Sequence, residues 1–359
     1  LTVTDASGNM KSCMATVTAQ DTTAPTAVCQ NITVFLDGSG NASITAADVD
    51  GGSSDNCSVS NLSASSTSFT CADLGANSVT LTLSDASGNM KSCMATVTVQ
   101  DTTSPTAVCQ NITVYLDGSG NASITASDVD GGSTDNCSVS NLSASPTSFT
   151  CSDIGGNPVT LTVSDAIGNM KTCMATVTVQ DTTSPTADCQ NITVYLDGSG
   201  NASITASDVD GGSADNCAVS NLSASPTSFT CADLGANSVT LTVSDASGNM
   251  KSCMATVTVQ DTTSPTAVCQ NITVYLDGSG NASITASDVD GGSVDNCAVS
   301  NLSASSTSFT CADLGANSVT LTVTDASGNM KSCMATVTVQ DTTSPTAVCQ
   351  NITVYLDGS

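Results

Sequence analysis

The chain has 359 residues with 32 acidic residues, all of them Asp, and 5 Lys as its only basic residues, so its net charge is −27. Nucleic acid and anionic membrane surfaces are excluded as partners, because both require clustered Lys or Arg. The sequence contains no stretch of 18 apolar residues, so no membrane span is predicted. It also contains no His, Arg, Glu or GxSxG motif, so no enzymatic activity is predicted.

The sequence repeats with a period of 80 residues. This period is too long for a solenoid unit and long enough for a small domain with its own core. The predicted organisation is a C-terminal part of a repeat, four full repeats and an N-terminal part of a repeat, at residues 1–20, 21–100, 101–180, 181–260, 261–340 and 341–359. The two partial repeats supply only 39 of 80 residues. We therefore expect a window of a longer array, rather than a subunit closed by strand exchange.

Apolar and polar residues alternate along the first full repeat, which is the pattern of half-buried β-strands. The pattern covers residues 32–36, 42–44, 79–83 and 93–99, separated by Gly- and Asn-containing turns such as 37–41 and 85–89. Many short strands with such turns predict a β-sandwich or barrel. Alternation alone predicts six strands. Termini at opposite poles require an odd number, so a seventh strand is expected between Cys57 and Ser78.

Several motifs resemble the hyalin repeat, an immunoglobulin-like module of extracellular adhesion proteins. They are Asp-Thr-Thr-x-Pro before Cys29, Asp55-Asn56-Cys57, Leu74-Gly75, and the segment 79–89 that leads to Cys93. The resemblance covers every copy. It implies an all-β tandem array of immunoglobulin-like β-sandwich domains that is stapled by disulfides. Cys29-Gln30 departs from the Cys-Pro common in that family, and most of the usual core aromatic residues are absent.

Each repeat contains four cysteines and few aromatic residues, so a thin core with disulfide staples is expected. Even cysteine usage without His indicates an oxidising compartment, and the absence of CxxC disfavours zinc. Four cysteines allow three pairings. We favour Cys57–Cys71 as a hairpin staple and Cys29–Cys93 between the first and last strands, while the other two pairings stay open. The expected disulfide cysteines are Cys29, Cys93, Cys57, Cys71, Cys109, Cys173, Cys137, Cys151, Cys189, Cys253, Cys217, Cys231, Cys269, Cys333, Cys297 and Cys311.

Five aspartates of each repeat are expected to meet at its N-terminal pole, because strand direction brings the linker, loop 47–56 and turn 85–89 to that end. Clustered carboxylates without a basic partner repel one another unless a cation binds. Calcium suits such a set because it takes six to eight oxygen ligands. The expected calcium ligands are Asp21, Asp48, Asp50, Asp55, Asp85, Asp101, Asp128, Asp130, Asp135, Asp165, Asp181, Asp208, Asp210, Asp215, Asp245, Asp261, Asp288, Asp290, Asp295 and Asp325.

A different interpretation is that Asp is common in turns because its side chain caps the local backbone. That interpretation accounts well for Asp37 and Asp73. Asp37 is nevertheless a weaker calcium candidate, because the turn of the preceding repeat should face the acidic pole across the joint.

These observations predict a secreted or cell-surface structural protein, a fibre or the stalk of an adhesin, stiffened by calcium at its joints and by intramodular disulfides. Its expected partner is itself, head to tail or as a longer chain. Recognition of a glycan or protein at a tip outside this segment stays open. Binding of a glycan or protein by the repeats themselves is the main alternative, and ice binding by rows of outward Thr, such as Thr80, Thr82, Thr96 and Thr98, is the minor one.

Overall fold

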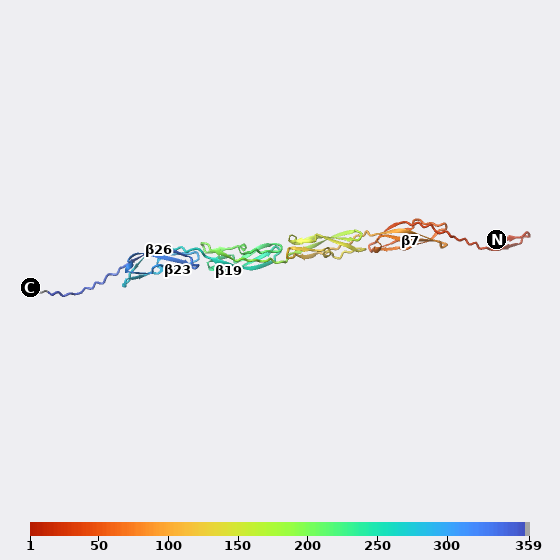
Figure 1. The fold of residues 1–359 in the computed structure, drawn as a ribbon. Helices are drawn as coiled ribbons and strands as arrows, with labels where there is room; N and C mark the ends of the chain where they lie inside the picture. The colour runs from red at the N-terminus through yellow and green to blue at the C-terminus, as the bar shows by residue number, and fades with distance from the viewer. Residues whose placement is uncertain (356–359) are drawn as a thin grey trace. The chain divides into compact units, whose positions relative to one another are not determined.

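The computed structural model describes residues 1–355, so the last four residues of the partial repeat 341–359 lie outside the described part. The chain divides into two compact units, Leu1–Asp181 and the unit that begins at Thr182 (Figure 1). Each unit contains two β-sandwich modules, which follow the repeats of the sequence. Strands and short 3-10 helices are the regular elements, and no α-helix occurs among residues 1–355. The fold is therefore all-β, as predicted.

The first unit begins with a short hairpin and continues with two modules of six strands and two 3-10 helices each. The hairpin strands are β1 (Thr2–Thr4) and β2 (Met10–Ser12). The first module contains β3 (Ile32–Phe35), β4 (Asn41–Ser43), η1 (Ala46–Val49), β5 (Val59–Ala64), β6 (Ser68–Thr70), η2 (Cys71–Asp73), β7 (Gly75–Asp85) and β8 (Met90–Gln100). The second contains β9 (Ile112–Tyr115), β10 (Asn121–Ser123), η3 (Ala126–Asp128), β11 (Val139–Ser145), β12 (Ser148–Thr150), η4 (Cys151–Asp153), β13 (Gly155–Asp165) and β14 (Met170–Gln180).

The second unit repeats this order in the third and fourth modules. The third contains β15 (Ile192–Tyr195), β16 (Asn201–Ser203), η5 (Ala206–Val209), β17 (Val219–Ser225), β18 (Ser228–Thr230), η6 (Cys231–Asp233), β19 (Gly235–Asp245) and β20 (Met250–Gln260). The fourth contains β21 (Ile272–Tyr275), β22 (Asn281–Ser283), η7 (Ala286–Val289), β23 (Val299–Ala304), β24 (Ser308–Thr310), η8 (Cys311–Asp313), β25 (Gly315–Asp325) and β26 (Met330–Gln340).

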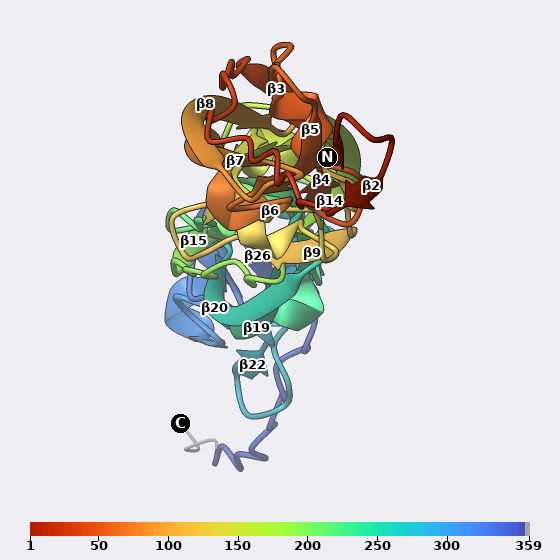
Figure 2. The same ribbon diagram turned by 90° about the vertical axis from the view of Figure 1, so that its right-hand side faces the viewer.

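Each module consists of a four-stranded sheet and a two-stranded sheet. In the first module the larger sheet has the order β3-β8-β7-β5, and β4 pairs with β6 in the smaller one. Figure 2 labels these six strands in a view turned by 90° from that of Figure 1. The strands β7 and β8 are antiparallel over their length, whereas β3 and β8 are parallel. Because the first and last strands of the module run in the same direction side by side, the chain enters at one end of the module and leaves at the other.

The expected seventh strand is not found among the described residues. The segment between Cys57 and Ser78 instead contributes two of the six strands, β5 and β6, together with the start of β7. The pairings explain how six strands still place the termini at opposite ends. Since β5 and β8 are both antiparallel to β7, β5 runs in the same direction as β3 and β8.

The core of each module lies between its two sheets and follows the predicted alternation. In β7 the side chains of Val79, Leu81 and Leu83 are fully buried, and in β8 Val97 is fully buried as well. The smaller sheet contributes Phe69, which is the one buried aromatic residue of the first module and is 3% exposed. Burial of these apolar surfaces stabilises the sandwich by about 25 cal/mol per Å², and the scarcity of aromatic residues keeps the core small.

The disulfides follow the prediction for one pair and contradict it for the other. Cys29 is bonded to Cys93, as predicted, and Cys109–Cys173, Cys189–Cys253 and Cys269–Cys333 repeat this bond. The hairpin staple Cys57–Cys71 is wrong, because Cys71 is bonded to Cys137 of the next module. In the second unit Cys231 is likewise bonded to Cys297. Cys151 and Cys217 are also disulfide-bonded.

The strand pairings explain why Cys57 and Cys71 are not bonded to each other. Cys57 precedes β5, whose first residue pairs with Asp85 at the entry end of the module. Cys71 immediately precedes β7, whose first residue pairs with Val99 at the exit end. The two cysteines are close in sequence but lie at opposite ends of a sandwich. Cys57 and Cys311 form no disulfide among the described residues.

Candidate metal centre at the module joint

Three carboxylates gather where the second module of the first unit meets the first. Asp101 follows β8, Asp135 lies in the loop before β11, and Asp165 is the last residue of β13. Antiparallel pairing of β11 with β13 places the Asp135 loop beside Asp165. The Asn169 amide donates a hydrogen bond to the Asp101 carbonyl oxygen (3.1 Å), which holds the linker against the same end. One carboxylate oxygen of each Asp lies within 4.8 Å of the others.

Asp101 and Asp135 each present one oxygen that is satisfied and one that is not. Asp101 Oδ1 accepts hydrogen bonds from the backbone N–H of Thr103 (2.9 Å) and from the Asn136 amide (3.2 Å). Asp135 Oδ2 accepts from the N–H groups of Cys137 (3.0 Å) and Ser138 (3.2 Å). Asp101 Oδ2 and Asp135 Oδ1 are buried and accept no hydrogen bond from the protein. Buried carboxylate oxygens without a partner cost several kcal/mol, which a bound cation would offset.

Asp165 is the most thoroughly hydrogen-bonded of the three. Its Oδ1 accepts from the backbone N–H groups of residues 167–169, and its Oδ2 accepts from the Asn169 amide (2.7 Å). Burial by itself would raise the pKa of Asp165, but the hydrogen bonds from Asn169, Gly168 and Ile167 outweigh it and hold the pKa below its usual value. Asp165 is therefore ionised at neutral pH, although only 4% of its surface is exposed.

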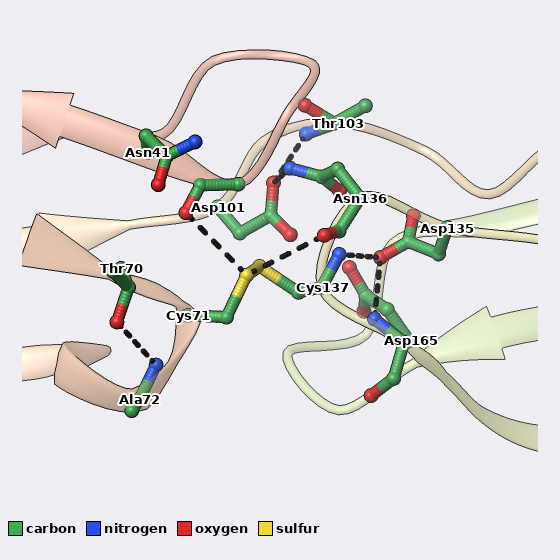
Figure 3. The surroundings of a disulfide bond; sticks show 12 residues. Asn41, Thr70, Cys71, Ala72, Asp101, Thr103, Asp135, Asn136, Cys137 and Asp165 are labelled. Carbon is green, nitrogen blue, oxygen red and sulfur yellow. Dashed lines mark hydrogen bonds between the residues drawn. A yellow bond between two sulfur atoms is a disulfide. The ribbon is translucent and has the colours of Figure 1, made fainter.

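Asn136 joins the acidic cluster to the preceding module (Figure 3). Its amide nitrogen donates to the carbonyl oxygen of Asp37 in the first module (3.1 Å) as well as to Asp101. Its Oδ1 is buried and accepts no hydrogen bond from the protein. The Asn136 side chain thus links the Asp37 turn of the first module to the linker at Asp101 and to the loop of the second module that carries Asp135.

The joint disulfide Cys71–Cys137 lies directly beside this cluster (Figure 3). The sulfur of Cys71 is 3.5 Å from the carbonyl oxygen of Asn136. Gly40 closes the other side with a φ of 76°. A Cβ at this position would lie 2.7 Å from Cys71 Sγ and 2.8 Å from the Asn136 carbonyl oxygen, so the close packing of the two modules requires glycine here.

An equivalent cluster recurs in the fourth module. Within the second unit, Asp261, Asp295 and Asp325 form the same group, and Asn296 donates to the carbonyl oxygen of Asp197 (3.0 Å). The positions that correspond in the third repeat are Asp181, Asp215 and Asp245.

The first module of the chain also has the cluster, formed by Asp21, Asp55 and Asp85. Hydrogen bonds from the Asn89 side chain and from backbone N–H groups lower the pKa of Asp85. The neighbouring Cys57 is a free thiol, and its hydrogen bond to Asp21 raises its pKa. The cluster itself is therefore independent of the joint disulfide.

Two of the five expected ligands, Asp48 and Asp50, are not among the carboxylates that lie within 4.8 Å of one another in the first module. Asp48 is hydrogen-bonded through Oδ2 to the backbone N–H (2.6 Å) and hydroxyl (2.8 Å) of Thr45, where it caps η1. Asp50 accepts from the N–H of Ser53 (3.0 Å). Their local capping role is the one that the sequence suggested for turn aspartates. The equivalent residues of the other modules make the same local hydrogen bonds, and they are Asp128, Asp130, Asp208, Asp210, Asp288 and Asp290.

Asp37, the weaker candidate, also caps its own turn, because its Oδ1 accepts from the N–H groups of Ser39 (2.8 Å) and Asn41 (3.0 Å). Only its carbonyl oxygen takes part in the joint. The residue that sequence reasoning missed is Asn136. Its signal was the Asp-Asn-Cys motif, which places an amide between a cluster carboxylate and a joint cysteine.

Comparison with known proteins gives no family assignment. No family model matches the chain, and no curated protein matches its sequence. Similar solved structures are tandem arrays of cadherin or immunoglobulin domains. They include the extracellular cadherin domains 1–5 of protocadherin gamma B2, with a TM-score of 0.29 and 11% identity over 90% of this chain and 82% of that chain.

Two further similar structures are built from immunoglobulin domains. Titin domains I67–I69 give a TM-score of 0.32 and 11% identity over 66% of this chain and 99% of that one. Sidekick-1 immunoglobulin domains 1–4 give a TM-score of 0.28 and 10% identity over 89% of this chain and 100% of that one. Identities this low carry no information on function. Among the described residues, no helix has the length and apolar character that a membrane crossing requires.

Proposed function

We propose that this chain is a structural spacer, a segment of an extracellular fibre or of the stalk of a surface adhesin, whose joints are stiffened by calcium and disulfides. The observation that carries the proposal is the joint between the first two modules. Its covalent connections are the backbone after Gln100 and the bond Cys71–Cys137. Bending or twisting about one linker is then opposed by a second link, as a rigid stalk requires. Disulfides of this number favour an oxidising, extracellular location.

Calcium is the cation that the donor set favours. The joint offers oxygens from Asp101, Asp135 and Asp165, and a further buried amide oxygen from Asn136. Calcium accepts carboxylate and amide oxygens in a flexible geometry and completes its shell with water, whereas zinc favours nitrogen and sulfur ligands. When bound, it would offset two of the three negative charges of the cluster and connect the linker to the second module.

Calcium stoichiometry tests this part of the proposal. Asp135→Asn removes the charge of a cluster ligand, so the full chain should bind one calcium ion fewer in a calorimetric titration. Asp128→Asn is the matched control, because it removes the same charge from a capping residue outside the cluster. It should leave the number of bound ions unchanged. Equal loss in both variants, or no calcium binding by the parent chain, would refute calcium at the joint.

A binding module is the second candidate. The outer face of the four-stranded sheet carries Tyr115 and Met174, which are 59% and 70% exposed. The strand pairings place Gln180 beside Tyr115 and Thr160 beside Met174, and no charged residue lies between Met174 and Gln180 on β14, in a chain that is otherwise strongly acidic. Such a neutral face suits a glycan or a protein surface. A glycan-array screen of the full chain, with and without calcium, tests this alternative.

A further inference from the structure

The disulfides within the modules define how tension would pass along the chain. In the first module Cys29 lies just before β3 and is bonded to Cys93 near the start of β8. Force that arrives from the N-terminal side can therefore cross directly to β8 and leave along that strand. The 64 residue steps between Cys29 and Cys93 are bypassed, and the next bypass begins at Cys109, 16 steps beyond Cys93.

We propose that the array is a tether whose length tension cannot increase greatly, even when its modules unfold. This goes beyond the proposed spacer function, because it depends on the connectivity of the disulfides and needs no calcium. The geometry of β8 supports it. β8 is an interior strand that is loaded along its axis from Cys93 onward, and this part has four residue pairs to β3 and seven to β7 that must shear together. Its inward residues Ala95, Val97 and Val99 are nearly completely buried.

The limiting length follows from the chain itself. Sixteen residue steps span at most about 55 Å when fully extended, and the Cα atoms of Cys29 and Cys93 are 5.8 Å apart. Each module can thus reach roughly 60 Å, whereas 80 residues without disulfides would reach about 270 Å. A folded module advances by roughly 40 Å, from an eleven-residue strand at about 3.3 Å per residue plus a joint. Tension then lengthens the array about 1.5-fold instead of about sevenfold.

The joint disulfide provides a second, longer route. From Cys253 of the third module the chain runs 16 steps to Cys269. The alternative passes back 22 steps to Cys231, across to Cys297 and on by 36 steps to Cys333, or 58 steps in all. Because this route is longer, it carries no tension while Cys269–Cys333 is intact. The longer route carries the tension only when the Cys269–Cys333 bond is missing.

Single-molecule stretching of the full chain between peptide handles tests the proposal through three paired-cysteine variants. Removing Cys231 and Cys297 together should leave the unfolded length unchanged. Removing Cys269 and Cys333 together should add 42 steps, about 140 Å, and removing all four should add 64 steps, about 220 Å. These lengths depend on covalent connectivity, so destabilised variants still report them.

A different ranking of the three variants would overturn the proposal. A gain in the variant without Cys231 and Cys297 alone would place that bond on the loaded route. An equal gain with and without that bond in the absence of Cys269–Cys333 would show that it gives no second route. Extension of the oxidised parent chain to about 270 Å per module would also overturn it. Repeating the measurement in chelator should change none of these lengths, which separates this inference from the proposed calcium function.

Discussion

Removal of the joint disulfide should destabilise the first unit by an amount that the chain connectivity sets. The bond Cys71–Cys137 closes a loop with a sequence separation of 66 residues. The other disulfides of this unit do not shorten the loop, because Cys93 and Cys109 lie inside it while their partners, Cys29 and Cys173, lie outside. In the chain-entropy account a loop of this size is worth about 4 kcal/mol. The double variant Cys71→Ser, Cys137→Ser should lose about that much.

Urea unfolding of the full chain measures this loss. With a slope of about 2 kcal/mol per M, the transition of the affected modules should move down by roughly 2 M. Chelator should be present, so that any contribution from calcium is absent. The double variant Cys109→Ser, Cys173→Ser removes a bond that closes a loop of nearly the same size, so it should lose a similar amount. A loss below about 1 kcal/mol in the joint variant alone would refute covalent coupling of the two modules.

Two other perturbations test the joint and the caps. Gly40→Ala should destabilise the joint by about 1–3 kcal/mol in thermal unfolding, because φ is 76° and the new Cβ would meet Cys71 Sγ. Gly38→Ala, where nothing lies within 4 Å, should be neutral or slightly stabilising, and an equal loss there would contradict the packing account. Hydrogen bonds from the backbone of Asn41 and Ser39 lower the pKa of Asp37. A lowered folded pKa adds stability above the ordinary Asp value of about 4, and acid removes it. The difference in unfolding free energy between the calcium-free parent and its Asp37→Asn variant should therefore be constant from pH 7 to 5 and shrink below about pH 4, and a difference that grows in acid would contradict this.

The strands that the sequence predicted are those with a regular period of two. In β7 and β8 large apolar residues alternate with Thr and Ser over eleven residues, so the core face can be read directly. The strand β5 gives no such signal. Its register shifts between Val59 and Asn61, which breaks the alternation, and its other inward residues include the small Ala64. A bulge of this kind moves side chains to the other face without leaving a trace in composition.

The missed disulfide follows from the same gap. Because the sequence pattern does not reveal β5 and β6, it suggests that Cys57 and Cys71 lie on the two sides of one hairpin. In the structure these strands place the two cysteines at opposite ends of the module. Pairing across a joint also depends on how neighbouring modules meet, which periodicity within one repeat does not determine. The pair Cys29–Cys93 was predictable because it depends only on the first and last strands being neighbours.

The acidic cluster was predictable to the level of loops but not of side chains. Strand direction brings Asp21, Asp55 and Asp85 to one end, and the structure places them together. Asp48 and Asp50 share a loop with Asp55 but turn to nearby backbone N–H groups. Asp21 and Asp55 also accept hydrogen bonds from the backbone N–H groups of their own turns through one oxygen, but the other oxygen of each stays buried without a hydrogen-bond partner. The sequence does not show which turn aspartates keep such an oxygen.

We propose that calcium occupies the joint between the disulfide-linked modules. Crystals of the full chain grown with calcium, with anomalous diffraction data, would locate the ion directly. The account predicts an ion bound by Asp101 Oδ2, Asp135 Oδ1 and an Asp165 oxygen, at calcium–oxygen distances of about 2.3–2.6 Å. An anomalous peak at Asp128 or Asp130 instead, or a joint without a peak at saturating calcium, would contradict it.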